Sequence, residues 1–181
     1  LPFELGTSIG SECDIASPHY CKVTVKRGCN ADGVEIPKSL LGGYWLSSAD
    51  CLCIVALSPS GRLVCAHAGR DSLFDRKKML TGTPSRKNES VVDSIAELLG
   101  PEFKETKFFL TCGIESEHLT HPWNHPEHGA TPKRPVEYIT SSWGESEVRG
   151  KKQAGCINLK SLVIKQLEQY DSDGFISSDG I

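Results

Sequence analysis

Two short apolar runs on either side of a cluster of turn-forming residues constrain the fold of this chain more than any other feature. The runs occupy residues 51–57 and 62–68, and the segment between them reads Ser-Pro-Ser-Gly. Proline and glycine favour tight turns, and short apolar runs bounded by such residues are typical of buried strands. The sequence therefore predicts a β-hairpin that carries both runs.

Other segments of the chain show strand or helix periodicity. The predicted strands lie at residues 21–25, 44–46 and 107–112, the predicted helices at residues 89–99 and 159–167, a turn at residues 28–33 and a polar loop at residues 81–87. Ser90 and Asp93 form a capping pair for the first helix, and Asn158 caps the second. The order of strands and helices predicts an α+β fold with layered α/β packing.

The length and charge of the chain limit what it can contain and bind. Its 181 residues are enough to bury one core, so we expect a single domain over residues 1–181. A formal net charge of -3 and a pI near 6.1 provide no basic field, which argues against a nucleic acid partner. The longest apolar stretch, residues 51–57, is far shorter than the about 20 residues of a membrane-spanning helix, so we expect no membrane partner.

Eight cysteines raise the question of disulfide bonds. They stand at positions 13, 21, 29, 51, 53, 65, 112 and 156. Several fall in strand-like runs, where free thiols behave as small hydrophobic side chains, and a chain of this size needs no covalent staples. No secretory signal is visible at the start of the sequence. We therefore predict reduced thiols and a cytoplasmic location.

Cysteine and histidine side chains alternate with apolar ones along the predicted hairpin. Because strand side chains alternate between faces, Cys51 and Cys53 share one face of the first strand, and Cys65 and His67 share one face of the second. A three-residue loop, 58–60, would place Cys51 directly opposite His67, with Cβ atoms about 4.5–5.5 Å apart. A loop longer by two residues would place Cys53 opposite His67 instead.

Cys51 and His67 are the candidates for chemistry. Both lie at ends of the predicted strands, where loops begin and solvent can enter. A thiol that faces an imidazole can share a metal ion with it or form a thiolate that is hydrogen-bonded to it. Cys53 and Cys65 are flanked by apolar residues, so we interpret them as core packing.

Three segments around these residues resemble a known family. Residues 49–52 read Ala-Asp-Cys-Leu, residues 61–69 read Gly-Arg-Leu-Val-Cys-Ala-His-Ala-Gly, and residues 31–34 read Ala-Asp-Gly-Val. This pattern resembles the signature of the YfiH-type family, also called laccase-domain or purine nucleoside phosphorylase family proteins. The resemblance extends over most of residues 30–170, and it implies a mixed β-sheet sandwich flanked by helices.

The YfiH resemblance implies a metal centre of two histidines and one cysteine. In this chain the ligands would be His19, Cys51 and His67, with zinc as the metal or copper as its alternative. Cys51, His67 and Arg70 would be the catalytic residues, and Arg70 would bind phosphate. The implied activity is a zinc-dependent glycosyl transfer, hydrolysis or deamination of a purine nucleoside, or, with copper, polyphenol oxidation of the laccase type.

A second resemblance implies a different reaction. Bacterial glutamine deamidases of the CNF and CheD type are similar in using a cysteine and then a histidine on neighbouring strands. Cys51 would then be the nucleophile, His67 would lower the pKa of its thiol, and the substrate would be a side-chain amide of a partner protein. A secreted effector is the alternative location that this second resemblance allows. A third alternative is a binding module without activity, because the tryptophan that follows His-Ala-Gly in the YfiH family is missing here.

Two features outside the hairpin have simpler interpretations. Four histidines between residues 118 and 128 form a spaced cluster, but the prolines among them oppose a helix, so we predict an exposed loop. Residues 171–174 read Asp-Ser-Asp-Gly. We interpret them as a polar tail rather than a calcium loop, because Phe175 occupies a ligand position.

Overall fold

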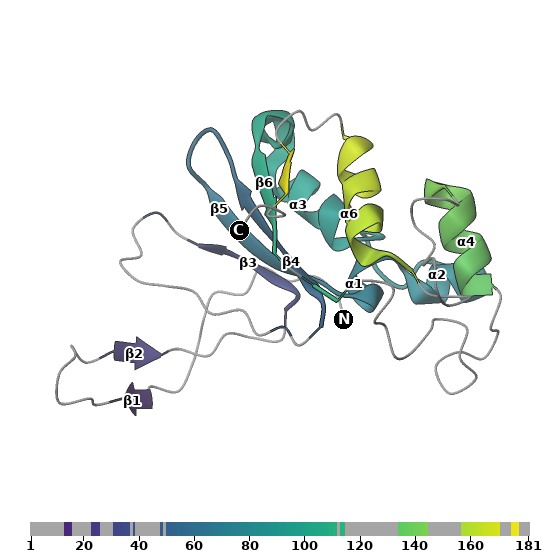
Figure 1. Cartoon of the computed structure of the whole chain (residues 1–181), viewed down its shortest axis with the longest axis horizontal. Coiled ribbons are helices and arrows are strands. Elements are labelled where there is room, and N and C mark those ends of the chain that lie inside the picture. Colours follow the sequence, from purple (N-terminus) through teal and green to yellow (C-terminus); the bar gives the residue numbers. More distant parts are fainter. Residues whose placement is uncertain are drawn as a thin grey trace.

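A five-stranded sheet forms the centre of the molecule, with its strands in the order β3-β5-β4-β6-β7 (Figure 1). The structure is a computed structural model that describes residues 13–15, 23–25, 31–36, 38, 48, 50–111, 113–114, 134–144, 157–170 and 175–177. The strands of the sheet are β3 (Gly33–Ile36), β4 (Leu52–Leu57), β5 (Leu63–Ala68), β6 (Lys107–Leu110) and β7 (Phe175–Ser177). All neighbouring strands are antiparallel except β6 and β7, which are parallel. A separate antiparallel pair consists of β1 (Cys13–Ile15) and β2 (Val23–Val25).

Helices gather on one side of this sheet (Figure 1). Helices α1 (Arg70–Leu73) and α3 (Val91–Leu99) contact β5, and α6 (Leu159–Glu168) packs on both of these helices. Helix α2 (Arg76–Thr81) contacts α4 (Arg134–Trp143), and the 3-10 helix η1 (Gly100–Glu105) follows α3 directly. The predicted α+β class is confirmed. Within the described ranges, no helix combines the length and the apolar character that crossing a bilayer requires.

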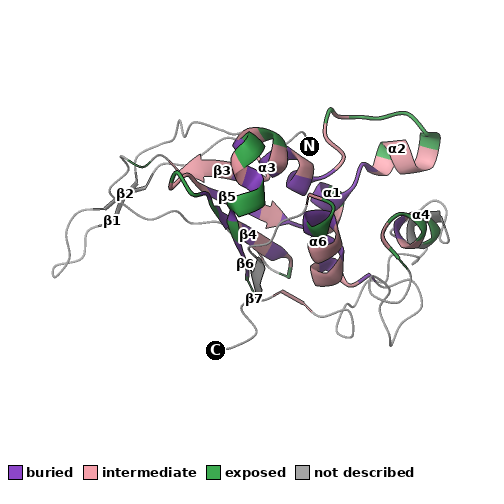
Figure 2. Cartoon of the chain, turned by 90° about the horizontal axis from the view of Figure 1, so that it is seen from above, coloured by how far each residue is buried: buried purple, intermediate pink, exposed green. Residues whose placement is uncertain are grey.

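Alternate residues of the two central strands build the core. Ile54 of β4 and Val64 and Ala66 of β5 have no exposed surface. The residues between them, such as Val55, face the other side of the sheet and are half-buried. In Figure 2 the buried residues gather where the sheet meets α1, α3 and α6. The apolar alternation of the sequence therefore selects the face of the sheet that the helices cover.

Side-chain caps fix the starts of the two main helices as predicted. The Ser90 N–H donates to Asp93 Oδ2 at 2.8 Å, and the Asp93 N–H donates to Ser90 Oγ at 3.1 Å. Asn158 Oδ1 accepts a hydrogen bond from the Ser161 N–H at 3.1 Å. These bonds satisfy N–H groups that have no partner within the helix, so both predicted helix starts are confirmed.

The hairpin of β4 and β5 has a longer loop than the three residues considered from the sequence. Cys53 pairs with His67, and the loop extends over residues 58–62. Gly61 has a φ of 79°, a left-handed conformation that favours glycine, and it helps to close the turn. The register that put Cys51 opposite His67 is therefore wrong, and the alternative with Cys53 opposite His67 is correct.

Several elements of the structure differ from the sequence predictions. β3 begins inside the predicted turn at 28–33, α2 ends inside the predicted loop at 81–87, and β7 follows directly on the segment interpreted as a polar tail. The predicted strand at 44–46 and the histidine cluster between 118 and 128 lie outside the described residues.

Candidate functional site

Cys51 and His67 meet above the backbone of Gly69. A Cβ atom placed on Gly69 would lie 3.2 Å from Cys51 Sγ, 3.1 Å from His67 Nε2 and 2.4 Å from His67 Cε1. The sulfur and Nε2 are therefore no further apart than the first two distances together. The φ of −82° and ψ of 170° at Gly69 are open to any residue, so the site needs glycine for space. The structure thus brings these two candidate residues to one point.

The hairpin register explains how a pair that is not opposed in the ladder can still meet. Leu52 is the first residue of β4 and pairs with Ala68, so Cys51 lies just beyond the ladder, beside Gly69. The His67 side chain reaches along its strand to the same place. A register shift of two residues leaves every side chain on its original face, so the two side chains still share a face.

Backbone contacts hold Cys51, which is half-buried. Its carbonyl oxygen accepts a hydrogen bond from Ser48 Oγ, and the carbonyl oxygen of Asp50 accepts one from the Ile114 N–H at 2.8 Å. Burial raises the pKa of the Cys51 thiol, and the Asp50 carboxylate adds to this rise, whereas the Arg70 N–H that donates to the sulfur opposes it. Because the net pKa shift is upward, the thiol keeps its proton at neutral pH unless a base or a metal ion takes it.

His67 is held from two sides. Its backbone N–H donates to the Asp32 carbonyl oxygen at 2.6 Å, and the Ser72 hydroxyl lies 3.0 Å from the His67 carbonyl oxygen. The Asp32 carboxylate reaches the ring itself, since its Oδ1 lies 3.9 Å from His67 Nδ1. This distance is too long for a hydrogen bond but short enough for the charge to act on the imidazole. His67 therefore has the Asp32 carboxylate near Nδ1 and the space that it shares with Cys51 near Nε2.

Asp32 is not among the functional residues predicted from the sequence. Residues 31–34 contribute there only to the family resemblance. Asp32 directly precedes β3, where Gly33 pairs with Ala66, and so it lies beside His67. The available signal was an acidic residue next to a short strand, but no local pattern indicates which strands of a sheet will pair.

Arg70 contributes its backbone directly to the site. It is the first residue of α1, and its N–H faces the Cys51 sulfur. Its Nε lies 3.6 Å from Asp71 Oδ1, and its guanidinium charge still helps to lower the pKa of the Cys51 thiol. The charge of Arg70 therefore acts on the Cys51 side of the centre.

The described residues supply two donors that suit a metal ion. A thiolate and an imidazole are both typical zinc ligands, and Cys51 and His67 approach one point. In the described part of the chain, no three His, Cys, Asp or Glu side chains are grouped so that they could hold a metal ion. His19, the third ligand expected from the resemblance, lies outside that part. The pair therefore fits two positions of a zinc site.

Cys53 and Cys65 lie on the sheet face opposite to the core. Both are half-buried free thiols, and neither belongs to the buried cluster under the helices. Burial raises the pKa of the Cys65 thiol, and the nearby Cys53 adds to the effect. The interpretation of these two cysteines as core packing is therefore wrong, because odd-numbered residues of β4 and β5 face away from the helices.

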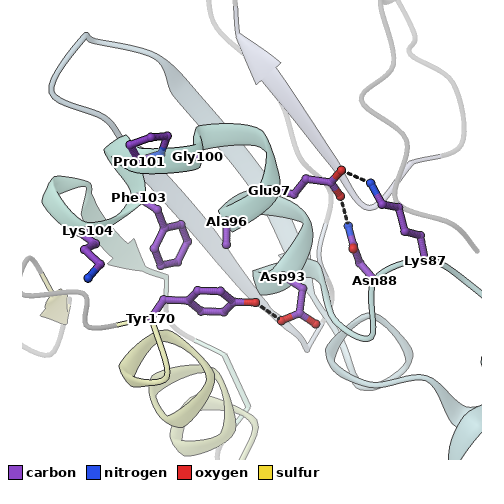
Figure 3. Close-up of a pocket in the computed structure, with 10 residues that line it drawn as sticks. All are labelled: Lys87, Asn88, Asp93, Ala96, Glu97, Gly100, Pro101, Phe103, Lys104 and Tyr170. Atoms are coloured by element: carbon purple, nitrogen blue, oxygen red, sulfur yellow. Dashed lines mark hydrogen bonds and ion pairs between the residues drawn. The ribbon is translucent and has the colours of Figure 1, made fainter.

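A pocket of about 610 Å³ lies apart from the Cys/His pair, between α3, η1 and the end of α6 (Figure 3). Phe103 and Tyr170 form its apolar part, with ring centroids 5.0 Å apart. The Tyr170 hydroxyl donates to Asp93 Oδ1 at 2.6 Å, and Glu97 binds two side chains of the rim. Among the described residues, these polar groups bond to one another, which makes the pocket a weaker candidate for a ligand site than the Cys/His pair.

Comparison with protein-family models, with curated proteins and with solved structures found no match for this chain.

Proposed function

We propose that this chain is an enzyme whose reaction centre consists of Cys51 and His67, with zinc as the metal and a purine nucleoside as the substrate. The convergence of Cys51 Sγ and His67 Nε2 on the space above Gly69 is the observation that carries the proposal. The resemblance of residues 49–69 to the YfiH-type signature supplies the substrate class. A half-buried thiol and imidazole at the end of a hairpin are also accessible to a small molecule.

Each residue of the proposed centre has a distinct role. Cys51 and His67 would hold zinc together with His19, and Arg70 would bind the phosphate that attacks the nucleoside. When bound, zinc would polarise an oxygen of water, phosphate or substrate. The raised pKa of the Cys51 thiol is compatible with this role, since a coordinated thiol gives up its proton. Copper in the same place would support oxidation of a polyphenol instead.

We also propose the finer architecture that the resemblance implies, a β-sheet sandwich flanked by helices and confined to one domain in the cytoplasm. The second face of the sheet supports this arrangement. Val55 and Cys65 are half-buried there, and Leu57 and Phe109 are the large hydrophobic side chains with the most exposure among the described residues. An apolar sheet face is stable in water when another layer packs on it.

Metal content and nucleoside turnover test the proposed function together. The full chain should bind about one zinc ion, measured by inductively coupled plasma mass spectrometry, and should release a free base or a deaminated product from adenosine, inosine or guanosine, measured by chromatography with and without phosphate. Cys51→Ser and His67→Ala should lose both properties. Cys53→Ser is the matched control, because Cys53 is the neighbouring thiol on the same face, and it should keep both. A metal-free chain that turns over no nucleoside contradicts the proposal.

A second candidate function is supported by the two groups that flank the pair. The Arg70 N–H donates to the Cys51 sulfur, and Asp32 lies behind His67, as in enzymes that use a cysteine nucleophile. The Cys51 thiolate would attack a glutamine side-chain amide of a partner protein and release ammonia. Water would then hydrolyse the thioester, which leaves a glutamate and restores the thiol.

Thiol reactivity separates the second candidate from the first. In a deamidase, a metal-free chain should be alkylated by iodoacetamide at Cys51 much faster than at Cys53 or Cys65, as read by peptide mass spectrometry. It should also release ammonia from a glutamine-containing protein substrate. If the chain shows neither zinc binding, nucleoside turnover nor selective alkylation, the remaining alternative is a binding module without activity.

A further inference from the structure

Asp32 faces the ring nitrogen of His67 that points away from Cys51. Its Oδ1 lies 3.9 Å from Nδ1, whereas Nε2 lies on the Cys51 side, 3.1 Å from the Cβ position above Gly69. The imidazole therefore has a carboxylate near Nδ1 and, near Nε2, the space above Gly69 that it shares with the Cys51 sulfur. Neutral His67 carries a single ring proton, and the different surroundings of the two nitrogens determine which of them holds it.

Backbone contacts hold Asp32 in this place. The backbone N–H of His67 donates to the Asp32 carbonyl oxygen at 2.6 Å. The ladder between β3 and β5 continues from there, with Gly33 paired to Ala66. The Asp32 side chain is 23% exposed and, with Ser72 and other polar residues, lines a cavity of about 240 Å³. The carboxylate therefore keeps contact with water while its backbone is fixed beside the histidine. The 3.9 Å between Asp32 Oδ1 and His67 Nδ1 is longer than a hydrogen bond, but contacts of catalytic groups often shorten when an enzyme binds its substrate, and one water can bridge such a gap.

We propose that Asp32 is the positioning residue of this centre, whose carboxylate keeps the His67 proton on Nδ1 and so directs the lone pair of Nε2 toward Cys51. A carboxylate only accepts hydrogen bonds, so it favours the tautomer with N–H at the nitrogen that it faces. The role rests on the proposed Cys51–His67 centre. It is the same whether Nε2 binds a metal ion or takes the thiol proton, since both need an unprotonated Nε2.

The ring nitrogens of His67 report this role directly. The full chain, labelled with ¹⁵N and treated with a chelator so that no metal ion decides the tautomer, is examined by long-range ¹H–¹⁵N correlation at a pH where the imidazole is neutral. The His67 signals are assigned by their loss in His67→Gln. We expect a protonated Nδ1 and an unprotonated Nε2 in the wild type. Asp32→Asn should move the proton toward Nε2, and Asp32→Glu, which keeps a carboxylate, should restore the wild-type pattern.

A matched control separates positioning from a general loss of negative charge. Asp50→Asn removes a carboxylate next to Cys51, and it should leave the His67 tautomer unchanged.

Zinc affinity gives a second measurement. If the centre binds zinc, Asp32→Asn should weaken binding by about 10–100-fold, as is typical when the partner of a ligating histidine is removed. The proposal is overturned if wild-type His67 carries its proton on Nε2, or if Asp32→Asn leaves the tautomer unchanged. Because the tautomer is read without metal or substrate, a chain without nucleoside turnover can still confirm or overturn the role of Asp32.

Discussion

Gly69 is the residue whose size decides whether the thiol and the imidazole can meet. Its backbone conformation is ordinary, so the reason for glycine is the space that both side chains occupy. It also precedes α1 as its N-cap, a position where glycine is favoured over alanine. A single methyl group at this position therefore tests the geometry of the centre with little change elsewhere.

Gly69→Ala should separate the site from the fold. The new methyl group would lie 2.4 Å from His67 Cε1, closer than real contacts allow, so the ring must move away. We expect the free energy of unfolding to fall by only about 1 kcal/mol, because alanine is a poorer N-cap than glycine. Whichever property the wild type shows, zinc binding or selective alkylation of Cys51, should be lost. A variant that keeps that property at the wild-type level contradicts the shared space above Gly69.

At the same scale, the sequence predicted which residues meet but not how they are paired. Cys51 and His67 follow from strand alternation alone, because a shift of two residues changes the register and preserves every face. The correct register depends on the loop, where Gly61 takes a left-handed conformation that the pattern of apolar residues does not encode. Asp32 was missed because its contact with His67 depends on the pairing of β3 with β5, which is not local in sequence.

At the scale of elements, the buried carboxylate of Asp75 joins α2 to the loop that leads to α3. It accepts hydrogen bonds from the Lys78 N–H at 3.0 Å and from the Ser85 N–H at 2.6 Å, and it is only 2% exposed. Burial alone would raise the pKa of this carboxyl. The hydrogen bonds, including one from the Arg86 N–H, outweigh that effect and lower the pKa to about 2.

Asp75→Asn should lower the free energy of unfolding by roughly 2 kcal/mol at pH 7. The pKa of Asp75 in the folded state lies below its value of about 3.9 in the unfolded chain. The stabilisation by the ionised carboxylate is therefore complete above about pH 3.9 and is lost as the pH falls through 2. The difference between wild type and variant in urea unfolding should therefore shrink between pH 5 and pH 2. Asp71→Asn is the control, since Asp71 is 61% exposed, and it should change stability by less than about 0.5 kcal/mol. A difference that does not depend on pH contradicts this account.

Ser90→Ala should lower the free energy of unfolding by about 1 kcal/mol, because it removes one half of the capping box of α3. The matched change Ser142→Ala lies on the exposed side of α4, where its hydroxyl bonds back to the helix. That variant should be neutral or slightly more stable, since alanine is the better helix former. Urea unfolding of both variants measures the difference, and equal effects would exclude the cap as the cause.

The elements that the sequence predicted are those whose signals are local. Helices α3 and α6 carry their own caps and apolar stripes, and β4 and β5 carry alternation beside a turn. The missed elements include the ten-residue helix α4 and several shorter ones. α1 has only four residues, and β7 has three and pairs in parallel with β6, so its position depends on a segment far away in the chain.

At the scale of the whole molecule, one packed core under the sheet holds the strands that carry the centre. Phe108 of β6 is fully buried and packs at a tilt against Phe103 of η1, with ring centroids 4.9 Å apart, and Phe103 in turn contacts Tyr170 after α6. β6 pairs with β4, the strand that begins directly after Cys51. The position of Cys51 therefore depends on packing that lies on the opposite side of the sheet.

The neighbouring residues Phe108 and Phe109 test this dependence, because both are phenylalanines and they lie on opposite faces of the sheet. Phe108→Ala should lower the free energy of unfolding by about 3–5 kcal/mol, since it leaves a cavity among buried side chains. Phe109 is 38% exposed, and Phe109→Ala should cost about 1 kcal/mol or less. Urea unfolding gives both values, and iodoacetamide labelling under native conditions shows whether Cys51 loses its distinct reactivity in the first variant alone. Equal destabilisation by the two changes would mean that another layer packs on the Phe109 face as tightly as the helices pack on the Phe108 face, as the proposed sandwich requires, and that the position of Cys51 does not depend on the core under the helices alone.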